Sequence, residues 1–196
     1  MTTTLFTNVH IATGMPGSTA AETTPLQDIL VEDGRFKKIG QRLVTKLATQ
    51  GMDISSIETI DLEGKLACPP FCDTHLHLDY VFTARKPGAV NESGTLFEGI
   101  QRWSETKSDL TVDEVKERAK IGIAKEMRHG VQFIRSHADV TDPNLTSLKA
   151  LLELKEELKD TVTLQIVSFP QEGMYSYEGP HGESGADLVE EGLKMG

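Results

Sequence analysis

The sequence has little cysteine, no long apolar run and no cluster of basic residues, and each of these features excludes some classes of protein. Cys68 and Cys72 are the only cysteines. Two thiols cannot complete a four-cysteine zinc site, and their spacing is not that of the redox Cys-x-x-Cys motif. We therefore expect two buried thiols at the start of a strand. No stretch of about 18 apolar residues is present, so no membrane span is predicted.

The charge of the chain also excludes some partners. It has 20 basic and 30 acidic side chains, which give a formal net charge of -10. An acidic chain without a basic run is a poor candidate for binding nucleic acid or an anionic membrane. The first ten residues lack the basic and apolar segments of a signal peptide. We therefore expect a cytoplasmic protein that binds neither nucleic acid nor a membrane, and the sequence leaves a homo-oligomer open.

The first 65 residues carry the patterns of short β-strands. Strands are predicted over 5–12 and 55–62, and a hairpin over 29–39 that turns at Asp33-Gly34, a favoured type I′ pair. A second turn is predicted at Glu63-Gly64, a loop of small residues over 13–25, and no definite structure over 41–52. These segments have too few apolar positions for an independent core. They are predicted to be part of a small β-sheet domain.

From Lys65 onward the pattern alternates between strand and helix. Strands are predicted from Leu66 into His77, over 131–140 and over 162–169. Helices are predicted from two capping boxes, from an N-cap followed by proline, and near the end of the sequence. Their starts are Thr95-Leu-Phe-Glu98, Thr111-Val-Asp-Glu114, Asp142-Pro143 and about Ala186, and Gly130 closes the second.

Three βα units in succession predict a parallel sheet, either a barrel or a doubly wound fold. No Gly-x-Gly-x-x-Gly follows the first of these strands, so a dinucleotide site is unsupported. A (β/α)8 barrel needs roughly 250 residues. Only 131 residues remain from Leu66 (196 minus 65). Either these residues are part of a larger fold or the fold is smaller than the pattern suggests, and we favour the first.

Two histidines at the end of the first barrel strand are the strongest candidates for chemistry. His75 and His77 are two positions apart, so in a strand they point to the same face. Functional groups collect at the C-terminal ends of parallel strands. Neutral imidazoles there could hold one divalent metal, which would activate a water molecule. The alternative is two histidines that are satisfied by hydrogen bonds.

The next strand repeats this arrangement with His137 and Asp139. A second pair of ligands would give a two-metal cluster. We favour a supporting role, in which His137 hydrogen-bonds into the site and Asp139 fixes a loop or an imidazole tautomer. Asp79 is expected to be a loop or helix-cap carboxylate.

The third strand is followed by Pro170, Gln171 and Glu172. The amide of Gln171 offers a donor and an acceptor, which would match the edge of a polar ring, although this residue taken alone is better explained as an exposed loop glutamine. Glu172 could be an acid/base group or a solvated carboxylate. Trp103 is expected in the core, although an aromatic near the cavity could also cover a flat ring.

Four segments resemble bacterial-type cytosine deaminases of the amidohydrolase superfamily. They are Cys68-Pro-Pro-Phe-Cys-Asp-Thr-His-Leu-His-Leu-Asp79, Asn91-Glu-Ser-Gly-Thr-Leu-Phe-Glu-Gly-Ile-Gln-Arg-Trp103, Arg135-Ser-His-Ala-Asp-Val140 and Leu164-Gln-Ile-Val-Ser-Phe-Pro-Gln-Glu-Gly173. The second and fourth segments are also similar to triazine-degrading amidohydrolases. The resemblance implies that 66–196 are the first three βα units of a (β/α)8 barrel and that 1–65 belong to a small β-sandwich.

The resemblance also implies roles for individual residues. His75 and His77 would be ligands of one divalent metal, iron or zinc, and Gln171 would hydrogen-bond the pyrimidine ring. The backbone near Leu96 would contact substrate. His137 lies on a strand where this branch takes no metal ligand, which favours the supporting role for it.

Other groups that the family uses are not found in these 196 residues. The family's third histidine ligand, its neighbouring glutamate, a further histidine and the metal-binding aspartate all lie on later strands, so no catalytic acid/base residue is expected here. We expect an N-terminal portion of an enzyme that converts cytosine to uracil and ammonia. The alternatives are release of an amine from a triazine or another cyclic amidine, or a truncated protein without catalytic activity.

Overall fold

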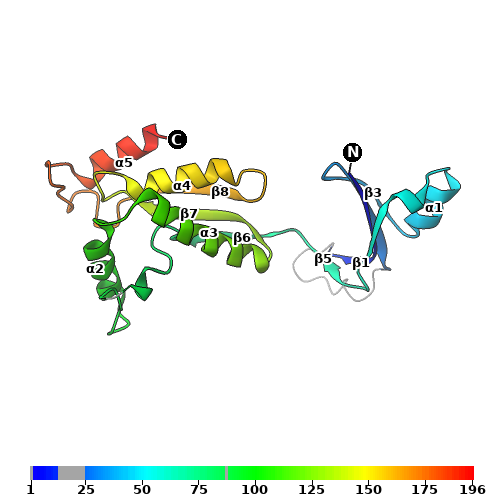
Figure 1. Ribbon diagram of the computed structural model, residues 1–196, viewed down its shortest axis with the longest axis horizontal. Helices are drawn as coiled ribbons and strands as arrows, with labels where there is room; N and C mark the ends of the chain where they lie inside the picture. The colour runs from blue at the N-terminus through cyan, green and yellow to red at the C-terminus, as the bar shows by residue number, and fades with distance from the viewer. Residues whose placement is uncertain (1, 13–24, 87) are drawn as a thin grey trace. The chain divides into compact units, whose positions relative to one another are not determined.

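The computed structural model describes residues 2–12, 25–86 and 88–196, and the chain divides into two compact units (Figure 1). The first unit is Met1–Pro69 and the second is Pro70–Gly196. The loop predicted over 13–25 lies almost entirely outside the described residues. Among the described helices, none is long and apolar enough to cross a membrane.

The first unit is built on one sheet with the strand order β3-β2-β1-β4, and β5 also pairs with β1. β2 is antiparallel to β1 and to β3, whereas β4 and β5 are parallel to β1. The strands are β1 (Thr3–Ile11), β2 (Gln27–Glu32), β3 (Arg35–Gly40), β4 (Glu58–Asp61) and β5 (Leu66–Ala67). The predicted hairpin is confirmed, and Asp33 (φ 48°) and Gly34 (φ 74°) have the positive φ angles of a type I′ turn.

A helix, α1 (Leu43–Thr49), occupies the segment for which the sequence predicted no definite structure. Leu43 and Leu47 pack with Leu5 and Leu30 in the small core of this unit. The buried carboxylate of Asp28 accepts the backbone N–H of Leu43 at 2.7 Å. The strand predicted over 55–62 is shorter than expected, because the 3-10 helix η2 (Ile54–Ser56) takes its first residues.

The second unit contains a parallel sheet with the order β6-β7-β8. Its strands are β6 (Phe71–Leu76), β7 (Val131–Asp139) and β8 (Thr163–Phe169), and its helices are η3 (Thr83–Arg85), α2 (Leu96–Lys107), α3 (Val112–Arg128), α4 (Thr146–Glu157) and α5 (Gly185–Lys194). The three predicted βα units are confirmed. Within the described residues the sheet is open and does not close into a barrel.

Helices α3 and α4 pack against each other and against β7, while α4 and α5 contact β8 (Figure 1). Ile134, Ala138 and Leu164 lie in the core that these helices cover. The alternate side chains Phe133, Arg135 and Gln165 are exposed. The apolar pattern of these strands therefore buries one face of the sheet.

The single strand predicted from Leu66 into His77 is wrong. Leu66–Ala67 pairs with β1 of the first unit, and β6 begins only at Phe71 and ends before His77. The interruption falls at Pro69-Pro70, where two residues lack the N–H that strand pairing needs.

The expectation of buried thiols is also wrong, because Cys68 and Cys72 are both exposed. Cys68 lies in the interruption between β5 and β6, and Cys72 lies on β6, an edge strand of the described sheet.

The predicted starts of α2 and α3 are confirmed. Thr95 Oγ1 accepts the N–H of Glu98, and Thr111 Oγ1 accepts the N–H of Glu114. The start predicted for α4 is wrong, because this helix begins at Thr146 rather than at Pro143. Asp142 accepts the N–H of Asn144 and Thr146, so it closes a turn ahead of the helix.

Candidate metal and substrate site

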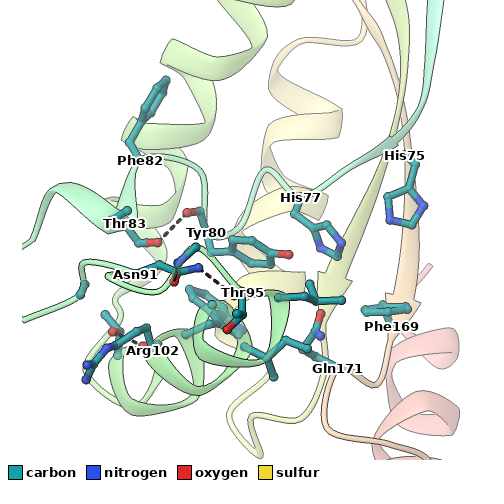
Figure 2. Close-up of a pocket in the computed structure, with 18 residues that line it drawn as sticks. His75, His77, Tyr80, Phe82, Thr83, Asn91, Thr95, Arg102, Phe169 and Gln171 are labelled. Atoms are coloured by element: carbon teal, nitrogen blue, oxygen red, sulfur yellow. Dashed lines mark hydrogen bonds between the residues drawn. The ribbon is translucent and has the colours of Figure 1, made fainter.

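A cleft of about 710 Å³ opens in the second unit beside α2, at the C-terminal ends of β6 and β8 (Figure 2). Its volume is within the range of small-molecule sites. Five of the residues discussed from the sequence line it together, and they come from three separate parts of the chain. They are His75, His77, Leu96, Trp103 and Gln171.

Three imidazole rings gather at the strand ends. His75 stacks on His137 with ring centroids 4.0 Å apart, and His77 lies 5.3 Å from His75 and 5.7 Å from His137. The register of β6 on β7 is irregular between Asp73 and Leu76, just where these rings lie. Burial lowers the pKa of His137, and the neighbouring His75 lowers it further.

One nitrogen of His77 is already engaged. Its Nδ1 lies 3.0 Å from the backbone oxygen of His137, so the Nδ1–H donates to that carbonyl. Burial is the largest influence on the pKa of His77 and lowers it, although this hydrogen bond opposes the shift. His77 is therefore neutral at pH 7, and the lone pair of Nε2 remains to bind a metal or a proton. A metal-ligating histidine is commonly held by its other nitrogen in this way.

The donor set fits part of a metal site. His75 and His77 converge on one cleft, and His77 is held in the tautomer that a metal ligand needs. Within residues 2–12, 25–86 and 88–196, no three His, Cys, Asp or Glu side chains come together to hold a metal ion. Two imidazoles supply only half of a four-coordinate shell.

Asp79 lies in the turn that follows β6, as expected for a loop carboxylate, but its side chain is not solvated. It is fully buried, and its Oδ2 accepts the backbone N–H of Asp139 at 2.8 Å. Its Oδ1 lies 3.9 Å from Nδ1 of His77 and has no hydrogen-bond partner among the described residues. Burial raises the pKa of Asp79 to about 7. Its spacing of two residues from His77 was the only signal in the sequence.

Tyr80 is a cleft residue that the sequence did not single out. Its ring stacks on His77 at 4.6 Å and lies 4.8 Å from the ring of Trp103. Burial raises the pKa of Tyr80 to about 12, so it remains a neutral phenol. Trp103 is buried as expected and also lines the cleft.

Asp139 lies behind the cleft and joins several elements. It is fully buried, and Oδ2 accepts from Trp103 Nε1 at 2.7 Å and from Lys107 Nζ at 3.1 Å. Oδ1 accepts from the backbone and hydroxyl of Thr141 and, at 3.3 Å, from the backbone of Gln171. One carboxylate thus fastens α2 and the loop after β8 to the end of β7.

The two residues after Pro170 face different surroundings. Gln171 lines the cleft, whereas Glu172 accepts from Ser104 Oγ at 2.8 Å and forms an ion pair with Lys107. This hydrogen bond and this ion pair hold the Glu172 side chain against α2. Leu96 begins α2 and is 75% exposed at the cleft.

A family model described as "Amidohydrolase family" matches residues 58–191, which is more than half of the chain. The chain therefore belongs to the amidohydrolase family. The predicted resemblance to cytosine deaminases is also confirmed, because a solved structure of this kind is similar to the chain. The crystal structure of 5-methylcytosine deaminase from Klebsiella pneumoniae, liganded with 5-fluorocytosine, is 37% identical with a TM-score of 0.77 and covers 98% of this chain.

Triazine enzymes are also similar. N-isopropylammelide isopropyl amidohydrolase of Pseudomonas sp. (strain ADP) is 33% identical over 122 residues, which is 60% of this chain and 30% of that protein. Triazine hydrolase from Arthobacter aurescens shares the fold, with a TM-score of 0.59 at 16% identity over 86% of this chain and 36% of that one. The chain spans 41% of the Klebsiella deaminase, less than half the length of each of these relatives.

Proposed function

We propose that this chain carries part of the active site of a metal-dependent hydrolytic deaminase that acts on cytosine or a similar aminated heterocycle and releases ammonia. One observation supports this most strongly. His75, His77 and Gln171 line a single cleft in a chain that is 37% identical to a 5-methylcytosine deaminase. Because the chain spans 41% of that deaminase, the activity is proposed for the whole protein and not for these 196 residues alone.

In this proposal His75 and His77 bind one divalent metal, iron or zinc. When bound, such a metal supplies Lewis-acid activation of a water nucleophile. His77 contributes Nε2, because the carbonyl of His137 holds its Nδ1–H. His137 supports the pair by stacking on His75 at 4.0 Å. In this proposal none of these 196 residues is assigned the acid/base role, so the chain alone is expected to be inactive.

The ring of the substrate lies in the cleft beside Gln171. The amide of Gln171 can donate to one ring atom and accept from its neighbour, as the edge of a pyrimidine requires. Leu96 contacts the substrate through the first turn of α2, and Tyr80 forms an aromatic wall next to His77. Asp139 holds α2 through the N–H of Trp103 and accepts a longer hydrogen bond from the backbone of Gln171.

The two units have different places in the proposed enzyme. Residues 66–196 correspond to the first three βα units of a (β/α)8 barrel, and the exposed sheet face is the side that the rest of a barrel would enclose. Residues 1–65 correspond to part of a small β-sandwich. Because Leu66–Ala67 pairs with β1, we place the boundary between the two units at Pro69 and Pro70 instead of at residue 65.

One alternative substrate class has support. The similarity to N-isopropylammelide isopropyl amidohydrolase favours release of an alkylamine from a triazine ring. Both reactions hydrolyse a carbon–nitrogen bond at an amidine carbon, so the same metal and the same amide could serve either substrate.

A substrate comparison tests the proposal. The product of the complete gene, loaded with Fe²⁺ or Zn²⁺, is given cytosine, 5-methylcytosine and N-isopropylammelide at equal concentrations. We expect ammonia release from a cytosine to have the highest kcat/KM. A higher kcat/KM for isopropylamine release would select the alternative, and no hydrolysis of any of the three would refute both.

A further inference from the structure

We propose that Lys107 and Glu172 are positioning residues that fix the orientation of Gln171 and so set the affinity of the site for its ring substrate. The proposal rests on the proposed function, because it takes Gln171 as the group that binds the ring. Neither Lys107 nor Glu172 is required to touch the substrate. They act through the backbone of the loop that carries Gln171.

Lys107 is an unusually buried cation. Its side chain is only 10% exposed, and its Nζ donates to Asp139 Oδ2 at 3.1 Å and to Thr141 Oγ1 at 2.8 Å. It also forms an ion pair with Glu172. One ammonium group thus joins the end of α2, the end of β7 and the loop after β8. A lysine is rarely buried to this extent unless it is paired.

Glu172 is the anchor on the loop. It follows Gln171 directly, and its carboxylate accepts from Ser104 Oγ at 2.8 Å as well as from Lys107. Its backbone oxygen accepts from Ser176 Oγ at 2.8 Å. Ser104 and Lys107 lie one turn apart on α2, and together they therefore hold the Glu172 side chain.

Gln171 lies between two restraints. On one side Pro170 fixes its own φ angle, and on the other Glu172 is tied to Lys107. The N–H of Gln171 is shared between Phe169 O at 3.1 Å and Asp139 Oδ1 at 3.3 Å, and both are at the long end of the hydrogen-bond range, so each is a weak restraint. The ion pair of Glu172 is thus the stronger restraint on this loop.

The first test separates binding from chemistry. In the metal-loaded product of the complete gene, Glu172→Ala releases the loop but leaves the buried Lys107–Asp139 pair in place. We expect KM for cytosine to rise about 10-fold with kcat changed less than about 2-fold, the pattern of lost ground-state binding. Glu172→Gln keeps an acceptor oxygen, so KM should rise less. An unchanged KM in Glu172→Ala would overturn the proposal.

A double-mutant cycle asks whether Glu172 acts through Gln171. Gln171→Ala should raise KM by itself, and adding Glu172→Ala to it should cause little further change. Fully additive effects would show that Glu172 acts elsewhere and would refute the positioning role. Lys107→Met should resemble Glu172→Ala in KM with the metal content unchanged.

Lys116→Met is the matched control. Lys116 is also a mostly buried lysine, with 15% side-chain exposure, and it forms ion pairs with Glu153 and Glu157. It joins α3 to α4, away from the cleft residues, so its loss should leave KM unchanged. An equal rise in KM would indicate general loosening of the unit and would contradict the proposal.

Hydrogen exchange gives a readout that does not depend on the substrate. Backbone amides of residues 169–176 should exchange faster in Lys107→Met and Glu172→Ala than in the wild type or Lys116→Met. Wild-type exchange in both variants would overturn the proposal even if cytosine is the substrate. Conversely, faster exchange in both variants, with no hydrolysis of any of the three substrates by the wild type, would refute the proposed function and leave the loop restraint supported.

Discussion

Replacing Asp139 by asparagine should destabilise the second unit strongly. The carboxylate is fully buried and accepts five hydrogen bonds, from Trp103, Lys107, Gln171 and twice from Thr141. In either orientation an asparagine amide would point its own N–H groups at some of these donors. Lys107 would also lose one of its two anionic partners.

The expected loss is about 3 to 5 kcal/mol in the free energy of unfolding, which is the cost of breaking a buried ion pair from one side. Urea unfolding measures it, and Trp103 is a convenient probe because it is the only tryptophan in the chain and contacts Asp139 directly. With an m-value of about 2 kcal/mol/M, the midpoint should fall by about 2 M.

Glu153→Gln provides the comparison. Glu153 is 54% exposed and shares Lys116 with Glu157, so its replacement should cost less than about 1 kcal/mol. An Asp139→Asn variant as stable as Glu153→Gln would refute the account of Asp139 as the buried junction of α2, β7 and the loop after β8.

Three further predictions concern other residues. Burial raises the pKa of Asp79 to about 7, so between about pH 4 and 7 this carboxyl binds more protons in the folded state than in the unfolded one. Its contribution to stability should therefore fall as pH rises, and urea titrations should show this fall in the wild type relative to Asp79→Asn. Gly122→Val should cost about 1 to 3 kcal/mol in the same assay, since even its Cβ would lie 3.2 Å from Leu78. Cys68 and Cys72 should both react with a thiol reagent without denaturant, and reaction only after unfolding would contradict their exposure.

Local signals predicted the elements of the second unit well. Thr95 and Thr111 cap α2 and α3 as expected, because each accepts the N–H of the residue three positions on. The strands β7 and β8 match their predicted ranges within one residue at either end. These signals depend only on neighbouring residues, which the sequence displays directly.

Structure that depends on distant partners was not predictable. The first N–H of helix α1, that of Leu43, is accepted by Asp28 on β2. The residue next to the helix makes no side-chain capping bond, so the local sequence carries no signal for its start. Leu66–Ala67 pairs with β1 instead of continuing into β6. The exposure of Cys72 follows from its place on an edge strand, which a one-dimensional pattern does not reveal.

The candidate site was only partly predictable. His75, His77 and Gln171 could be expected at one edge of a parallel sheet, because strand ends converge there. The burial of Asp79 and the link from Lys107 to Glu172 depend on how α2 packs against the strand ends. Helix packing of that kind leaves no periodic signal in the sequence.

The central claim is that His75 and His77 together hold one divalent metal ion. The most direct measurement is the metal content of the complete gene product after dialysis against Zn²⁺ and then against buffer. We predict about one metal ion per wild-type chain and in the control His129→Ala, and a large loss in His75→Ala and His77→Ala. Wild-type metal content in both of those variants would contradict the claim.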